Sequence, residues 1–415
     1  MKRNNVRRLL ALVLVAALCL LCGAAAQPNA TEIHIYSADD LVQLSKSCKL
    51  DTYSQGKTVY LDNDVDLSGS DFVPIPTFGG MFEGQGHTVS GLELSGDASH
   101  MGLFRYVQAV GTVRDLKITG NIDAAGTLNE IGAVVGTNYG TISGCSFNGT
   151  ISGENNVGGI AGTNESSGMI YNCKTEGFVE GDHYVGGIVG RLYAAGHITD
   201  CANYGAISSN WTGADQNSPT YVAEVGGIAG SSSGPITRSF NAGAVTVAQK
   251  GYGGVGGIAG VLKSAAISDC YNTGTITGPS RTAGIVSIAN DTASAIVKNC
   301  YNTGKIVSVS TSTNPACGTI AGTIANSNGD AIGSVENCYF LKGTYSYTSG
   351  STIHTDEMVG YPLDKGEANC KLASEMKLDA FAITLSPTDK TFNVDAENIN
   401  GGLLVSVTAP STGTV

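Results

Sequence analysis

One short phrase returns along most of the chain, and this repetition limits the possible folds more than any other feature. Its full form is Val-Gly-Gly-Ile-Ala-Gly. Copies begin at Ile131, Val157, Val185, Val225 and Val255, with weaker copies at Met101, Thr282 and Cys317. A phrase that recurs in this way is typical of a chain that stacks one structural unit on the next.

The second half of each unit has a pattern of its own. An Ile or Val is followed three residues later by a cysteine, and in most copies a glycine comes four residues after that cysteine. The cysteines are Cys145, Cys173, Cys201, Cys270, Cys300 and Cys338, and Ser239 takes the corresponding place between Cys201 and Cys270. The runs are short and rich in β-branched residues, and no window has a helical period. We therefore predict strands.

A single unit of this kind cannot bury its own apolar face, whereas stacked units bury a continuous core. The predicted fold is all-β, a right-handed parallel β-helix (β-solenoid) of about seven to nine coils, with the hand taken from the general rule for parallel crossovers. Ser37, followed by Asp39 and Asp40, predicts a short helix near 38–47 that caps the N-terminal end. A small C-terminal cap is expected at the other end.

The chain divides into five predicted segments. They are a signal peptide over 1–26, an N-terminal cap with the first coils over 27–100, the repeats over 101–340, a C-terminal cap over 341–404, and a tail or the start of a further segment over 405–415. The signal peptide is inferred from a basic start, an apolar run and small residues up to Ala26, near which cleavage is expected.

Cleavage would leave an acidic, exported chain. The first 26 residues hold four basic residues and no acid, so the formal charge would change from −12 to −16. A chain with this charge and no basic cluster is a poor partner for nucleic acid or for an anionic membrane. We expect a secreted or cell-surface protein without a membrane span after cleavage.

The glycine pair is predicted to bend the chain. Val157 and Ile160 lie three residues apart, so a flat strand would point them to opposite faces. The prediction is that glycine's freedom of backbone angles lets Gly158 and Gly159 turn both side chains inward. The pair recurs as Gly186, Gly187, Gly226, Gly227, Gly256 and Gly257. Ile142 and Cys145 have the same spacing, so a second bend is expected between them.

An Asn-x-Gly turn is predicted two residues after the cysteine position. The asparagines are Asn203, Asn241, Asn272 and Asn302. Asparagine tolerates left-handed backbone conformations, and its amide can bond to its own turn. Asparagines in stacked coils could also bond to one another.

The cysteine column could serve packing, disulfides or metal binding. Without Cys19 and Cys22 of the signal peptide nine cysteines remain, an odd number for a disulfide framework. Metal sites use Cys-x-x-Cys or a nearby histidine, and neither pattern occurs. In-register strands would give the cysteines parallel side-chain directions, which suit a disulfide poorly. We predict packing, with Ser239 marking a slot for a small residue and disulfides as the alternative.

The sequence resembles a known family. The phrases VGGIAG and NCYNTG, with DNDVDLSG and PIPTFGGMFEGQGHTVSGL before them, are similar to the GLUG-repeat proteins of bacteria. The resemblance covers about residues 33–340 and, weakly, 372–404. Such repeats occur in adhesin-like proteins and in some IgA-cleaving metallopeptidases. The resemblance implies a β-solenoid at the cell surface and supplies no catalytic residue in the repeats.

No motif supports catalysis. The peptidase relatives use His-Glu-x-x-His to hold zinc, and none of the six histidines here precedes a glutamate. Gly230–Gly234 matches the hydrolase pattern G-x-S-x-G, but no helix is expected after it. Asp62–Asp66 begins like a calcium loop, yet Leu67 stands where that loop needs glycine. We predict no catalytic residues, no metal and no cofactor.

Two features are candidates for binding. Glu130, Glu154, Asp182 and Glu224 fall shortly before copies of the Gly-Gly phrase, as a polar turn row or as a cation, sugar or catalytic site. The loop 208–221 enlarges one coil, carries the single tryptophan, Trp211, and ends at Tyr221. Loop aromatics can stack on sugars or anchor a protein. The alternative is that Trp211 packs back onto the solenoid wall.

These observations favour an exported, non-enzymatic β-solenoid that acts as an adhesive, ligand-binding or spacer module at a bacterial surface. Its expected partner is a host or microbial glycan or a surface protein. The alternative is a carbohydrate-active β-helix enzyme of the polysaccharide lyase or glycoside hydrolase type, which needs carboxylates grouped on one face. Convergence of the four acids with a basic residue such as Arg191 would favour the enzyme.

Overall fold

The computed structural model describes residues 31–371 with short gaps, together with three later strand segments. The gaps are 97, 125–128, 212–222, 248–252, 290–291, 310–315, 327, 350–351 and 364–369, and the later segments are 383–384, 391–395 and 404–408. The predicted signal peptide lies outside the described residues.

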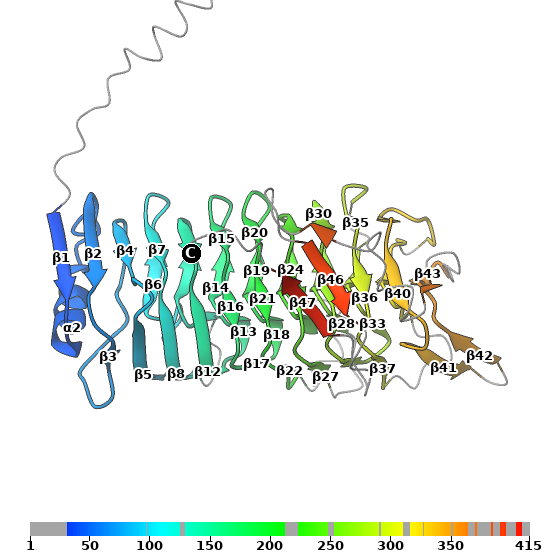
Figure 1. The fold of residues 1–415 in the computed structure, drawn as a ribbon, viewed down its shortest axis with the longest axis horizontal. Coiled ribbons are helices and arrows are strands. Elements are labelled where there is room, and N and C mark those ends of the chain that lie inside the picture. The colour runs from blue at the N-terminus through cyan, green and yellow to red at the C-terminus, as the bar shows by residue number, and fades with distance from the viewer. Residues whose placement is uncertain are drawn as a thin grey trace, which may run out of the picture.

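Short parallel strands stack along one axis and form a β-solenoid (Figure 1). Sheet A contains β1(Thr31–Ile35), β2(Lys57–Leu61), β4(Met81–Glu83), β7(Thr112–Arg114), β11(Thr141–Ser143), β15(Met169–Tyr171), β20(His197–Thr199), β25(Ile236–Thr237), β30(Ala266–Ser268), β35(Ile296–Lys298) and β39(Ser334–Glu336). Sheet C contains β6(Phe104–Val107), β10(Val135–Asn138), β14(Ala161–Asn164), β19(Val189–Leu192), β24(Ala229–Ser232), β29(Ala259–Leu262), β34(Val286–Ile288), β38(Ala321–Thr323) and β43(Val359–Tyr361).

Two further sheets contain the other parallel strands of the solenoid. Sheet B contains β3(Val65–Asp66), β5(Thr88–Ser95), β8(Lys117–Asp123), β12(Ser146–Ser152), β16(Lys174–Thr175), β17(Phe178–Gly181), β21(Ala202–Asn203), β22(Ile207–Ser209), β26(Phe240–Asn241), β27(Val245–Val247), β31(Tyr271–Asn272), β32(Ile276–Gly278), β36(Tyr301–Asn302), β37(Ile306–Ser308), β40(Tyr339–Leu341) and β44(Cys370–Lys371). Sheet D contains β9(Asn129–Gly132), β13(Asn155–Gly158), β18(His183–Gly186), β23(Ala223–Gly226), β28(Gly253–Gly256) and β33(Arg281–Ala283).

The chain passes through sheets A, B, D and C in turn, as in β11, β12, β13 and β14, before β15 starts the next coil. Sheet C has one strand in each of nine coils. The predicted all-β parallel solenoid is therefore confirmed, while its right-handed sense stays a prediction.

The N-terminal helix lies where the sequence predicts it. α2(Ala38–Ser47) stands beside β1 at the N-terminal end (Figure 1). The Asp40 carboxylate accepts hydrogen bonds from the Ser37 backbone N–H at 3.0 Å and from the Ser37 hydroxyl at 2.9 Å. Leu41 and Leu44 are buried in the same core as the strands, so the helix covers apolar side chains of the first coil.

The chain bends at the Gly-Gly pair. Val157 and Ile160 are both fully buried, because β13 ends at Gly158 and β14 begins at Ala161. The reason differs from the expected one, since neither glycine of the pair has a positive φ. A Cβ on Gly158 would lie 2.1 Å from the Ala161 carbonyl oxygen, and one on Gly159 would lie 2.2 Å from the Gly187 carbonyl oxygen. Glycine is needed here for close backbone approach.

A second bend lies one residue before the cysteine position, between sheets A and B. The residue there has a positive φ in eight successive coils, namely Asp115, Gly144, Asn172, Asp200, Arg238, Asp269, Asn299 and Asn337. Asparagine and aspartate hold six of these places, since they adopt the left-handed conformation more readily than other side chains. This bend orients the cysteine side chains inward.

The asparagines of the Asn-x-Gly turn form a buried ladder. Each Nδ2 of Asn203, Asn241 and Asn272 donates to Oδ1 of the next asparagine, ending at Asn302, over 2.7, 2.8 and 2.8 Å. Each also donates to the carbonyl of the glycine two residues later, at 2.8–2.9 Å. These asparagines have no positive φ, contrary to the expectation, because the left-handed position is the one before the cysteine.

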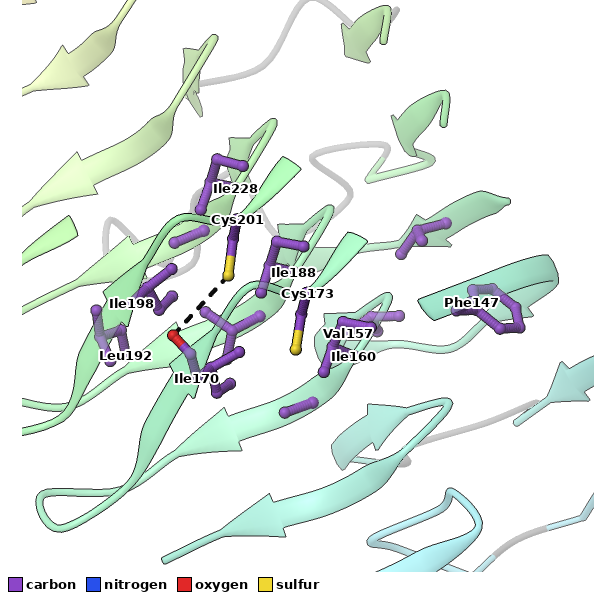
Figure 2. Packing of buried hydrophobic residues seen from close by; sticks show 14 of the residues in the cluster. Phe147, Val157, Ile160, Ile170, Cys173, Ile188, Leu192, Ile198, Cys201 and Ile228 are labelled. Atoms are coloured by element: carbon purple, nitrogen blue, oxygen red, sulfur yellow. Dashed lines mark hydrogen bonds between the residues drawn. The ribbon is translucent and has the colours of Figure 1, made fainter. Parts of the chain in front are cut away.

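The cysteine column packs inside the solenoid, as Cys173 and Cys201 show in Figure 2. All cysteines of the column are buried and free. Each thiol donates a hydrogen bond to the backbone carbonyl two residues earlier, as Cys201 Sγ does to the Thr199 carbonyl at 3.3 Å. Burial raises the pKa of Cys173 and Cys300 well above the usual value. The column therefore holds neutral, apolar thiols.

We expect the column thiols to resist a thiol-specific reagent in the native protein and to react quickly in denaturant, because only an accessible thiolate is nucleophilic. Cys270→Ser should cost about 1 kcal/mol or less. The reason is Ser239, whose Oγ donates to Thr237 at 2.9 Å much as Cys270 Sγ donates to Ser268 at 3.1 Å. The absorbance of the group that the reagent releases measures the rate of thiol labelling. Urea unfolding measures the stability of Cys270→Ser. Rapid native labelling would contradict the packing role.

Parallel stacking continues beyond residue 340, since β43 pairs with β38 and β44 pairs with β40. β41(Ser346–Ser349) and β42(Thr352–Thr355) form an antiparallel hairpin, and β45(Ile383–Thr384), β46(Thr391–Asp395) and β47(Leu404–Thr408) form an antiparallel sheet. Among the described residues, no helix has the length and apolar character needed to cross a bilayer.

Candidate functional site

The four acidic residues predicted as a row occupy two different columns of the solenoid. The pairing of sheet D aligns Glu130 with Asn156, then with Tyr184, then with Glu224. Glu130 and Glu224 are therefore three coils apart, roughly 14 Å at the usual strand spacing. Glu154 and Asp182 lie in a separate column in adjacent coils.

Glu154 and Asp182 are linked through the backbone, where the Asp182 N–H donates to the Glu154 carbonyl at 2.8 Å. Burial raises the pKa of the Asp182 carboxyl, and the neighbouring His183 opposes that effect. The structure thus brings Glu154 and Asp182 into neighbouring positions but does not gather all four acids with Arg191 into one site.

Trp211 lies against the solenoid wall. Its ring centroid is 4.2 Å from that of His183, and the side chain packs on the hydrophobic core while partly exposed. Tyr221, the other predicted aromatic of this loop, lies outside the described residues.

A groove of about 440 Å³ follows the outer corner between sheets A and B. A volume of this size falls within the range of small-ligand sites. Its walls come from six successive coils and include the left-handed bend residues and the first residues of sheet B. The lining residues are Gly86, Asp115, Lys117, Gly144, Cys145, Ser146, Asn172, Cys173, Lys174, Asp200, Cys201, Ala202, Tyr204, Arg238 and Phe240.

An ion pair fixes the planar polar groups at one end of this groove. Arg238 Nε donates to Asp200 Oδ1 at 2.9 Å, and Nη2 donates to Asp200 Oδ2 and to Thr199 Oγ1, both at 2.9 Å. The hydrogen bonds to Asp200 raise the pKa of Arg238. A bidentate pair of this kind holds both side chains in one plane, so it offers a preorganised polar surface to a ligand.

Lysines line the other half of the groove. Lys117 is exposed, and Lys174 Nζ lies 2.8 Å from Glu176 Oε1 at the surface. Sheet B aligns Lys117 with Ser146, and Ser146 with Lys174, so flexible donors alternate with a small hydroxyl along the solenoid axis. The groove therefore presents repeated hydrogen-bonding groups at the spacing of the coils.

Tyr204 and Phe240 form an aromatic wall of the groove. The Tyr204 and Phe240 rings meet edge to face with centroids 5.4 Å apart, and Tyr204 is 51% exposed. Phe240 stacks on Tyr271 at 4.7 Å, and Tyr271 stacks on Tyr301 at 5.0 Å, in the same column of sheet B. The exposed Tyr204 ring beside the fixed polar groups suits the apolar and hydroxyl faces of a sugar.

None of the residues predicted for binding lines this groove, although the repeats carry one signal for it. Aligning the copies at the residue directly after the cysteine position shows Lys174, Ala202, Phe240, Tyr271 and Tyr301 in succession. The first three are exposed or partly exposed, whereas the two tyrosines are buried. The arrangement can bind and orient a ligand. Within the described part of the chain, no group of three or more His, Cys, Asp or Glu side chains is placed to hold a metal ion.

Comparison with known proteins gives partial similarities. No protein-family model matches the chain. A halomucin from Haloquadratum walsbyi is 30% identical over 159 residues, which cover 34% of this chain and 2% of the length of that protein. An immunoglobulin A1 protease-like structure from Bacteroides ovatus has a TM-score of 0.39 and 18% identity, covering 83% of this chain and 85% of its own. An IgA1 protease structure has a TM-score of 0.44 and 15% identity, covering 80% of this chain and 23% of its own.

Proposed function

We propose that this protein is a secreted or surface-displayed β-solenoid that binds carbohydrate through the corner groove and performs no catalysis on it. The groove between sheets A and B, with its aromatic wall and the fixed ion pair of Arg238 and Asp200, is the observation that carries this proposal. The signal-like N-terminus and the similarity of one third of the chain to a halomucin support exposure outside the cell. In this role the protein is an adhesive module of a bacterial surface.

The arrangement of polar groups supports a saccharide more than an apolar ligand. Tyr204 offers an exposed ring, while Asn172, Asp200 and Lys117 offer donors and acceptors along the same groove. Sugars present both an apolar C–H face and hydroxyls, so they use both kinds of surface. None of the four acids predicted as a row lines the corner groove, so none of these carboxylates faces a ligand bound there. This supports binding over the enzymatic alternative, which needs a carboxylate pair at the ligand.

We expect the mature chain from residue 27 to bind at least one oligosaccharide on a glycan array. Tyr204→Ala combined with Lys117→Ala should weaken this binding at least tenfold, which corresponds to about 1.4 kcal/mol. Calorimetry with the best array ligand measures the change. Tyr36→Ala is the matched control, because Tyr36 is similarly exposed, at 57%, but lies at the N-terminal end.

Three results would count against this function. Absence of binding to every glycan would remove the carbohydrate role and leave a spacer. Unchanged affinity in the double variant would remove the groove as the site. Release of new reducing ends or of unsaturated products from the bound oligosaccharide would favour the alternative, a carbohydrate-active enzyme.

A further inference from the structure

The corner groove runs along the solenoid axis. Its lining residues begin at Gly86 and end at Phe240, and they come from six successive coils. At the usual spacing of parallel strands, the five intervals between these coils give a groove of about 24 Å. The sugar rings of an extended polysaccharide repeat at nearly the spacing of the coils. A groove of this length and direction therefore suits a linear chain of about five sugars better than a single sugar.

Two lysines stand at a fixed separation along this groove. Sheet B pairs Lys117 with Ser146 and Ser146 with Lys174, so the three residues lie in one column of successive coils. Both lysines are exposed, and all three residues line the groove. The backbones of the two lysines are two coils apart, which is about 10 Å at the usual strand spacing. The groove thus places a positive charge at every second coil, with a hydroxyl in between.

The acidic residues that line the groove have basic neighbours of their own. The Asp200 carboxylate accepts two hydrogen bonds from Arg238. Asp115 lies near Arg114, whose pKa is raised mainly by its bond to Glu83 and further by the charge of Asp115. The charge that remains for a ligand in the groove is therefore that of the two lysines, in a chain whose formal charge is −12.

Lys174 already contacts one carboxylate at the surface. Its Nζ lies 2.8 Å from Glu176 Oε1, and the two side chains are 49% and 42% exposed. Water screens an exposed pair of this kind, so the pair contributes little stability and a ligand carboxylate can share or replace it. An ammonium group also has three N–H donors, of which Glu176 Oε1 takes one. Lys174 is thus available to a ligand, although Glu176 weakens its attraction for an acidic one.

The exposed Tyr204 ring lies on the same line as the lysines. Sheet B pairs Lys174 with Ala202, so Tyr204 stands one coil beyond Lys174. Burial raises the pKa of Tyr204, and the charge of Lys174 opposes this effect, which shows that the two side chains are near each other. A sugar that stacks on Tyr204 therefore has its neighbour in the chain beside Lys174.

We propose that the corner groove binds a linear acidic polysaccharide that carries a carboxylate on every second sugar. The polysaccharide lies along the solenoid axis, and two of its carboxylates accept hydrogen bonds from Lys117 and Lys174. The uncharged sugar between them lies at Ser146, and a further sugar stacks on Tyr204. This inference rests on the proposed carbohydrate-binding function and names the class of ligand for the same groove.

The test uses the mature chain from residue 27 and a hyaluronan hexasaccharide, in which glucuronate alternates with an uncharged sugar. The matched ligand is the same hexasaccharide with its carboxyl groups reduced to alcohols. Hexagalacturonate, which is charged on every sugar, is the second comparison. Calorimetry is expected to show about tenfold weaker binding of the reduced hexasaccharide, because it loses two exposed ion pairs. Hexagalacturonate should bind more weakly than the hyaluronan hexasaccharide.

Three variants locate the charge that the ligand recognises. Lys117→Gln should weaken binding of the acidic hexasaccharide about fivefold and leave binding of the reduced one unchanged. Glu176→Gln should strengthen binding of the acidic hexasaccharide about twofold, because it removes the competing carboxylate. Lys305→Gln is the control and should change neither affinity, since Lys305 is an exposed lysine outside the groove. Thermal unfolding of each variant checks that it is folded.

The outcomes separate this inference from the proposed function. Equal affinity for the acidic and reduced hexasaccharides, or the same loss for both in Lys117→Gln, would overturn the acidic ligand and leave carbohydrate binding by the groove standing. Tighter binding of hexagalacturonate than of the hyaluronan hexasaccharide would overturn the alternate spacing of the charges. No binding of any of these ligands or of any array glycan would overturn both this inference and the proposed function.

Discussion

Gly227→Ala is expected to destabilise the protein by about 3 kcal/mol or more, at the upper end of what overpacking one methyl group usually costs. The added Cβ would lie 2.2 Å from the Gly257 carbonyl oxygen and 2.3 Å from Asn241 Cγ. Neither neighbour can move alone, because the first is backbone of the next coil and the second belongs to the asparagine ladder. Urea unfolding followed by circular dichroism measures the loss.

The control for this variant distinguishes a steric clash of the added Cβ from the cost of placing alanine at a positive φ. Gly56 has a φ of +70° and nothing within 4 Å of its added Cβ, so Gly56→Ala tests the backbone conformation alone and should cost about 1–2 kcal/mol. Gly227 has no positive φ, so its cost comes from the clash. If Gly227→Ala lost no more stability than Gly56→Ala, close backbone approach would not explain the repeated glycine pair.

The same glycine pair shows how far a sequence can predict this fold. The spacing of Val157 and Ile160 was sufficient to predict a bend. Two apolar residues three positions apart can both be buried, as they are here, only if the strand bends between them. The cause of the bend was not predictable in this way. A glycine can be required because its φ is positive or because a neighbouring backbone lies too close for a Cβ. The second reason depends on the position of the next coil, which is known only when the register of the coils is known.

The left-handed positions show a similar limit. Asparagine in the Asn-x-Gly turn suggested a left-handed conformation there, yet the positive φ belongs to the residue before the cysteine, as at Asn172 and Asp200. Residue type alone favours both assignments, because asparagine and aspartate serve turns in several ways. The outcome is decided by the Asn203 amide, whose buried bonds to Asn241 and Gly205 require an extended backbone in β21.

The candidate binding surfaces were less accessible to sequence analysis than the fold. The repeated phrase identifies positions that have the same residue in every coil. The groove is also lined by positions whose residue changes from coil to coil, such as Lys117, Ser146, Lys174 and Ala202. Glu130 was singled out among acids, and the structure places it beside His100 and Asn156 instead of beside the other three. These contacts join neighbouring coils 26–30 residues apart, so only the register brings them together.

Asn241→Ala should cost about 3–6 kcal/mol, because each buried partner left without a bond costs roughly 1–3 kcal/mol. Asn241 donates to Gly243 O and Asn272 Oδ1 at 2.8 Å each and accepts from Asn203 Nδ2 at 2.7 Å. Alanine satisfies none of these three groups. Urea unfolding measures the effect, with Asn121→Ala as the control, since the Asn121 bond to Glu93 is exposed and its loss should cost about 0.5 kcal/mol or less.

A double variant tests whether the asparagines act as a ladder or as separate turns. Asn241 and Asn272 share one bond, so Asn241→Ala with Asn272→Ala removes that bond once, whereas the two single variants each count it. The double variant should therefore lose about 1–2 kcal/mol less than the sum of the singles, as expected for residues in one hydrogen-bond network. Strict additivity would mean that each amide stabilises only its own turn. Coupling would mean that the ladder ties successive coils together, which keeps the outward residues of sheet B in the register that forms the groove.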